Sequence, residues 1–268
     1  MTLYLAFDTS TEEVAIGLGL LRPEGVHLIG ETNIDVPRAS LTHLVPAIMR
    51  LLQTADLCMD DVRAVAVGRG PGSFTGVRIG VSAAKGVAQG LGVPLYGVNT
   101  LDAIAERFAG RVGLVGVIGD AMRREVYPAL YRLADGGVTR LSPDAVVPPA
   151  AAAAAWEQLG EPVLLSGNGL RKYADVFTQA MGASALIAPE ALWTPTGESL
   201  LMAAWRASVA GEAGTGDVAT LLPVYTRLSD AEEAERARRA AGAEPGPDAG
   251  PVGEHPSGVA GPGAGEGS

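Results

Sequence analysis

The sequence predicts an α/β fold of two lobes, followed by a tail without a core. Three observations support this. Short apolar runs alternate with segments whose apolar residues recur every three or four positions, the pattern of strands alternating with amphipathic helices. The pattern restarts near residue 112, again with a strand that ends in an aspartate. No aromatic residue follows Tyr225, and Gly and Pro make up 14 of the 27 residues from Gly242 to Ser268.

Bulk composition indicates a globular cytosolic protein. The 268 residues suffice for a sizeable core, and 47% of them are hydrophobic. No apolar run reaches the roughly 18 residues of a membrane span. An acid, Asp8, interrupts the first apolar run, so we expect no secretory signal. The single cysteine, Cys58, excludes an internal disulfide.

Charge argues against direct nucleic-acid binding. The formal net charge is −10 and the isoelectric point is near 4.8. Affinity for a phosphate backbone comes from clustered Lys and Arg, which a surface acidic on balance repels. We therefore expect any role with RNA to depend on a partner.

The first lobe is expected over residues 1–108. It begins with a β-meander, because three short apolar runs are separated by turn residues. In the helix that follows, Pro46 is tolerated only in the first turn, so the helix is expected to start near Thr42 or His43. The predicted elements are strands 3–8, 14–20 and 26–33, helix 41–55, strand 61–67, helix 74–90, strand 94–98 and helix 101–108 capped by Thr100.

The second lobe is expected over residues 109–228, and a disordered Gly-, Pro- and Ala-rich tail over 229–268. Pro128 predicts that its strand is an edge strand or carries a bulge. The predicted elements are strands 112–118 and 125–133, helix 150–159, strand 162–165, helices 173–181 and 199–210, and an extended piece at 222–225. Two α/β lobes that each open on an acid-terminated strand indicate an actin-like, duplicated ribonuclease-H fold.

Two carboxylates and one loop are candidates for nucleotide chemistry. Asp8 with the hydroxyls of Thr9 and Ser10 could hold a hydrated magnesium ion and a phosphate, but the same residues commonly form turns. Asp120 is either a second such acid or part of a salt-bridged surface turn. The loop 68–73 lacks the Lys-Ser pair of a P-loop, and Ser73 replaces the third glycine of a dinucleotide fingerprint. We favour a strand-to-helix turn with Ser73 as N-cap.

The sequence contains little evidence for a metal site or for an activated nucleophile. The three histidines, His27, His43 and His255, have no paired spacing, so no metal site is predicted. Ser73, Ser82 and Cys58 have no neighbouring base that would activate them, so no catalytic residue is assigned.

Two helices of the first lobe could contact a partner. Leu44, Ile48 and Leu51 form an apolar stripe on helix 41–55. A small-residue face on helix 74–90 would let another helix approach closely; it comprises Gly76, Gly80, Ala83 and Val87. The alternative is that both faces are buried in the chain's own core.

Several motifs closely resemble those of the TsaB (YeaZ) family. The most specific is the run 68–80, and the resemblance covers residues 1–228. Further matching segments are 8–11, 84–88, 92–94, 97–101, 120–127 and 223–227. The family belongs to the actin-like ATPase superfamily, so the resemblance implies two lobes with a cleft.

The resemblance also implies a function. Members are non-catalytic subunits that form a heterodimer with a TsaD-like catalytic subunit, joined by a TsaE-like ATPase. The complex transfers threonylcarbamoyl to the adenosine next to the anticodon of tRNAs that read codons beginning with A. We therefore expect contact with tRNA only through the complex, no required cofactor and no membrane. Binding of ATP or ADP in the complex stays open, as does a homodimer of the isolated chain.

Carried onto this sequence, the resemblance assigns two groups of residues. The partner-binding group is Leu44, Ile48, Leu51, Ser73, Phe74, Gly76, Val77, Gly80, Ala83, Ala84 and Val87. A vestigial nucleotide cleft would be formed by Asp8, Thr9, Ser10, Asp120, Gly167 and Gly169. On this hypothesis Gly80→Leu abolishes pairing by overpacking, while the isolated chain still folds.

Three rival interpretations remain. A small-molecule kinase or ATPase would use Asp8 and Asp120 to hold magnesium and nucleotide, with 166–169 as the adenosine loop. A glycoprotease would need a metal site or nucleophile that the sequence does not offer. A homodimeric binding module would use the same helix faces.

Overall fold

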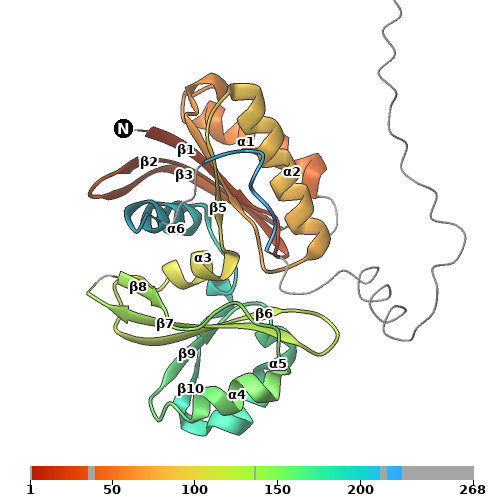
Figure 1. Ribbon diagram of the computed structural model, residues 1–268, viewed down its shortest axis with the longest axis vertical. Helices are drawn as coiled ribbons and strands as arrows, with labels where there is room; N and C mark the ends of the chain where they lie inside the picture. The colour runs from red at the N-terminus through yellow and green to blue at the C-terminus, as the bar shows by residue number, and fades with distance from the viewer. Residues whose placement is uncertain (1, 36–39, 136, 212–215, 225–268) are drawn as a thin grey trace, which may run out of the picture. The chain divides into compact units, whose positions relative to one another are not determined.

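Two five-stranded mixed sheets form the framework of the part that the computed structural model describes, which is residues 2–35, 40–135, 137–211 and 216–224. The predicted tail at 229–268 lies outside these residues. Figure 1 shows the arrangement. The first sheet has the order β3-β2-β1-β4-β5. Its strands are β1 (Thr2–Asp8), β2 (Glu13–Arg22), β3 (Gly25–Asp35), β4 (Ala64–Gly68) and β5 (Leu95–Val98).

The second sheet repeats the topology of the first. Its order is β8-β7-β6-β9-β10, so counting strands within each lobe gives 3-2-1-4-5 twice. In both sheets the first three strands are antiparallel and the first, fourth and fifth are parallel. This confirms the duplicated actin-like fold. The strands are β6 (Gly113–Asp120), β7 (Val126–Ala134), β8 (Gly137–Arg140), β9 (Val163–Ser166) and β10 (Ala185–Ile187).

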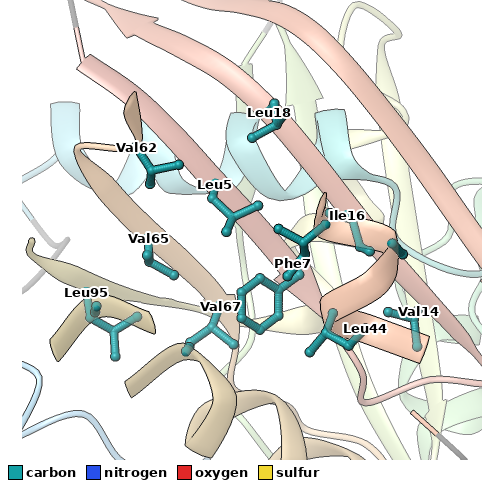
Figure 2. Packing of buried hydrophobic residues seen from close by; sticks show 14 of the residues in the cluster. Leu5, Phe7, Val14, Ile16, Leu18, Leu44, Val62, Val65, Val67 and Leu95 are labelled. Carbon is teal, nitrogen blue, oxygen red and sulfur yellow. The ribbon is translucent and has the colours of Figure 1, made fainter. Parts of the chain in front are cut away.

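Helices α1 (Ser40–Thr54) and α2 (Phe74–Leu91) supply the crossovers of the first sheet and pack on one of its faces. Figure 2 shows the core between these helices and the first sheet, where Leu5 and Phe7 of β1 are fully buried. The expected start of α1 near Thr42 or His43 was wrong. The helix begins at Ser40, so Pro46 lies inside it, where it removes one backbone hydrogen bond.

The other face of the first sheet is covered by a helix from the far end of the chain. Helix α6 (Gly197–Val209) buries Leu200 and Leu201 against β1 and β2. Gly17 of β2 and Gly197 touch through their backbones, because a Cβ on Gly17 would lie 2.6 Å from the Gly197 carbonyl carbon. The predicted lobe limits, 1–108 and 109–228, therefore do not match the packing of α6.

Helix α3 (Thr100–Glu106) also does not follow the predicted limits. It belongs to the first half of the sequence but packs against the second sheet. Leu101 and Ile104 pack against β6 and β7 of the second sheet, while Ala103 packs with α6. The cap of α3 is Asn99, whose Oδ1 accepts a 2.9 Å hydrogen bond from the Leu101 amide, and not Thr100. Each lobe thus receives a helix from the other half of the sequence.

Helices α4 (Pro149–Glu157) and α5 (Leu170–Met181) pack with the second sheet around Trp156 and Phe177. Pro128 lies in the part of β7 that β8 does not reach, because β8 pairs only with Tyr131–Ala134. The proline therefore occupies a local edge, as predicted. Three short 3-10 helices complete the described elements: Met59–Asp61, Gly182–Ser184 and Glu190–Leu192.

None of the helices in the described ranges is long and apolar enough to cross a membrane.

The Gly17–Gly197 contact predicts that Gly17→Ala is destabilising. Alanine is otherwise compatible with a strand, but the added methyl would collide with backbone that cannot rotate away. We expect a loss of about 2 kcal/mol in the free energy of unfolding, the usual cost of overpacking. Urea unfolding measures it. The control is Gly86→Ala, whose added Cβ meets nothing within 4 Å; equal stability of the two variants would contradict the close contact.

Candidate functional site

The carboxylate of Asp8 is sealed inside the first lobe at the end of β1. It is 0% exposed. Its Oδ1 accepts a 2.6 Å hydrogen bond from the Ser10 amide, and its Oδ2 accepts one of 2.6 Å from the Thr100 hydroxyl. Gly68 leaves room for it, because a Cβ there would lie 1.9 Å from Oδ2. Burial raises the pKa of Asp8, although these hydrogen bonds act in the opposite direction.

The glycine face of α2 packs on the turn that follows Asp8. The Thr9 hydroxyl donates a 2.6 Å hydrogen bond to the Gly76 carbonyl. A Cβ on Gly76 would lie 2.0 Å from the Thr9 carbonyl oxygen, and one on Gly80 would lie 2.4 Å from Thr9 Oγ1. Ser73 is the N-cap of α2, as predicted, and its amide donates to the Ser10 carbonyl at 2.8 Å. The start of α2 is therefore fixed to the turn of the first two strands.

This geometry does not fit a magnesium site at Asp8. A hydrated Mg²⁺ needs a carboxylate oxygen that faces water or phosphate. Both oxygens of Asp8 accept short hydrogen bonds, and neither Thr9 nor Ser10 is more than 1% exposed. The Asp8–Ser10 segment acts as a hydrogen-bonded turn.

Asp120 ends β6 in a salt-bridged turn, the alternative considered from the sequence. Its carboxylate pairs with Lys172 of α5 and accepts a 3.0 Å hydrogen bond from the Met122 amide. Asn168 accepts from the Asp120 amide at 3.0 Å and donates to both carboxylate oxygens of Glu12 at 3.1 Å. Sequence reasoning missed Glu12 and Lys172, because both are remote in sequence from Asp120.

The glycines of the predicted adenosine loop pack against β6. Gly167 has a φ of +101°, and a Cβ on it would lie 2.4 Å from the Ile118 carbonyl oxygen. A Cβ on Gly169 would lie 2.8 Å from Cγ2 of Ile118. The glycines thus allow the loop to approach the strand closely.

Most residues assigned to partner binding belong to the first lobe's own core. Their burial corrects the expected contact face, since a partner cannot reach them without opening the lobe. Leu44, Ile48, Val77 and Ala84 are buried, and Gly76 and Gly80 face Thr9. Leu51, Ala83 and Val87 are partly buried against the same core. Ser73 and Phe74 are exposed.

Gly80→Leu would consequently disturb the chain itself and cannot report on pairing alone.

A different face of α2 is open. Ser82, Gly86 and Gly90 follow one another at intervals of four and are exposed. A Cβ on either glycine would meet nothing within 4 Å. Glycine inside a helix costs about 1 kcal/mol relative to alanine, so two unpacked glycines need a reason outside the described chain. On α1, Val45 is 47% exposed and Met49 39%.

The described residues do not support a nucleophilic role for Cys58 or a metal site. Cys58 is exposed, and its hydrogen bond to Asp61 raises the pKa of the thiol, which disfavours the nucleophilic thiolate. Among the described residues, no three His, Cys, Asp or Glu side chains are grouped so as to hold a metal ion.

The buried carboxylate predicts a pH effect for Asp8→Asn, an isosteric change that keeps one acceptor oxygen and places an amide donor where the second oxygen accepts a hydrogen bond. Because folding raises the pKa of Asp8, the wild-type chain loses stability as pH rises from the unfolded pKa through the folded one. The variant escapes this loss. Its stability relative to wild type should therefore increase as pH rises above the unfolded pKa of an aspartate, about 3.9, as measured by urea unfolding.

Asp61→Asn is the control with the opposite sign. Hydrogen bonds from Cys58 lower the pKa of Asp61, so the wild-type contribution is present above the unfolded pKa and is lost as pH falls. A constant stability difference for Asp8→Asn over the whole range would show that its carboxyl is not desolvated.

Comparison with known proteins agrees with this architecture. The family model described as "TsaD: tRNA N6-adenosine threonylcarbamoyltransferase" matches residues 35–235. The Bacillus subtilis protein named "tRNA threonylcarbamoyladenosine biosynthesis protein TsaB" is 32% identical over 228 residues, 85% of this chain and 95% of the relative. The Escherichia coli protein of the same name is 33% identical over 175 residues, 64% of this chain and 74% of the relative.

Solved structures give the same result. YeaZ from Pseudomonas aeruginosa matches with a TM-score of 0.69 at 31% identity, covering 84% of this chain and 100% of that one. A Pseudomonas aeruginosa protein described as similar to peptidase YEAZ gives a TM-score of 0.71 at 32% identity, covering 85% and 100%. The chain belongs to the TsaB (YeaZ) family.

Proposed function

We propose that the chain is a non-catalytic cytosolic subunit of tRNA threonylcarbamoyladenosine biosynthesis. It pairs with a TsaD-like catalytic subunit, and a TsaE-like ATPase joins the pair. The biosynthetic role rests on the names of the Bacillus and Escherichia relatives, the first of which matches over 95% of its length. The pairing role rests on the surface of the first lobe.

The observation that carries the pairing role is the exposed glycine pair on α2. Gly86 and Gly90 weaken the helix without packing against any described residue. A helix from another chain laid across Ser82, Gly86 and Gly90 could approach until the backbones nearly touch, which explains why side chains are absent there. Val45 and Met49 on α1 add exposed apolar surface in the same lobe.

The non-catalytic character is supported by Asp8. A kinase or ATPase of this architecture would present that carboxylate to magnesium and nucleotide. Here Asp8 is buried and bonded to Ser10 and Thr100, and Asp120 is paired with Lys172. No observation favours the kinase, and none favours the glycoprotease.

The glycine face predicts that a side chain in place of Gly86 stabilises the isolated chain but, when large, weakens pairing. Alanine should raise the free energy of unfolding of the isolated chain by about 1 kcal/mol, because helix propensity improves and the methyl meets nothing. Gly86→Leu should weaken pairing with the same organism's TsaD-like subunit at least roughly tenfold while the chain stays folded. Thermal unfolding and size-exclusion chromatography with light scattering measure the two effects.

Gln179→Leu is the matched control, since it adds a leucine to an exposed position of α5 in the other lobe. It should pair normally. Unchanged pairing by Gly86→Leu would exclude this face as the contact. A wild-type chain that forms only homodimers and never a mixed complex would exclude the proposed role and favour a homodimeric binding module.

A further inference from the structure

The turn between β6 and β7 holds three consecutive residues in the left-handed region. Met122, Arg123 and Arg124 have φ angles of +60°, +46° and +66°. Each such residue with a side chain is strained by about 1–2 kcal/mol, and glycine would remove the strain. The other described non-glycine residues with positive φ, Asp56 and Asp135, occur singly. A run of three therefore indicates selection for something other than stability.

Hydrogen bonds fix this turn from both sides. The Met122 amide donates to Asp120 Oδ1 at 3.0 Å, and the Glu125 amide donates to the Met122 carbonyl at 2.9 Å. Asp120 is itself held by Lys172 and Asn168. The backbone is thus set before any ligand arrives, so binding would not have to order it.

The turn exposes positive charge on a protein whose net charge is negative. Arg123 and Arg124 are exposed, and Met122 beside them is 63% exposed. Within the described part of the chain, Arg124 makes neither a hydrogen bond nor an ion pair. Asp120, at the start of the turn, pairs with Lys172; Arg123 and the next acid, Glu125, also have interactions within the protein. Guanidinium groups match the geometry of phosphate oxygens and keep their charge at any physiological pH.

We propose that Arg123 and Arg124 contact backbone phosphates of the tRNA while the catalytic partner holds it; this rests on the proposed function. Two phosphate contacts are too few for a chain of net charge −10 to bind RNA alone, but they add to an affinity supplied elsewhere. The site thereby orients the substrate from the second lobe.

A free nucleotide fits this turn less well than an RNA strand. The glycine loop beside it is packed onto Ile118, as Gly167 and Gly169 show, so no space opens for a base. Arg123 and Arg124 lie in the exposed turn between β6 and β7, which a long polyanion can reach. Charge complementarity with a repeating phosphate chain therefore favours RNA.

Glycine variants test the proposal without unfolding the turn, because a positive φ suits glycine. The double variant Arg123→Gly with Arg124→Gly, in complex with the TsaD-like subunit, should bind tRNA roughly tenfold more weakly at about 0.1 M salt. The slope of log affinity against log salt should shrink by about two, one for each lost phosphate contact. Filter binding measures both. Arg111→Gly, at an exposed arginine outside this turn, is the control and should change neither.

Each other outcome overturns the proposal. Unchanged tRNA affinity and slope in a complex that still forms would show that the turn does not touch RNA. Loss of pairing by the variant, with wild type pairing normally, would assign the arginines to a protein contact. A fall in ATP binding alone would assign them to a nucleotide. Failure of the wild-type chain to pair is a separate result, which refutes the proposed function itself.

Discussion

The packing of α2 against the turn after Asp8 is the constraint on which the first lobe depends. A carboxylate, two hydroxyls and the backbone of a helix occupy a volume that admits no further side chain. Gly68 makes room for Asp8, and Gly76 and Gly80 make room for Thr9. The glycine-rich run 68–80, the most specific motif of the sequence, is thereby explained as a packing device. The space inside this turn is occupied by the chain's own polar groups, the carboxylate of Asp8 and the hydroxyl of Thr9.

Much of the fold could be predicted, because alternating periods of two and about 3.6 residues mark strands and helices directly. The missed strands, β8 and β10, have four and three residues and show partly exposed, irregular patterns. It could not be predicted from the sequence that α3 packs against the second sheet and α6 against the first. Periodicity identifies an apolar face on each helix, as on α6 with Leu200 and Leu201, but not which sheet that face will cover.

The candidate site was predicted less well, for a related reason. Helix 74–90 was correctly identified, and its small residues were noticed, yet the helix has two small-residue faces. Gly76 and Gly80 lie inward, whereas Gly86 and Gly90 lie outward. Sequence spacing cannot distinguish them, because that depends on what lies opposite, here Thr9 of a distant turn. The link from Asn168 to Glu12 spans 156 positions and joins residues of ordinary surface types, so no local signal announces it.

The exchange of helices between the halves has a consequence for synthesis on the ribosome. One face of the first sheet, with Ala6, Ala15 and Ala66, stays bare until α6 emerges. That helix begins at Gly197, about 100 residues after β5 ends at Val98. At about 5–20 residues per second the nascent first lobe spends roughly 5–20 seconds with an unprotected apolar surface. The two halves therefore cannot fold one after the other, and neither is expected to fold stably when it is expressed as a separate fragment.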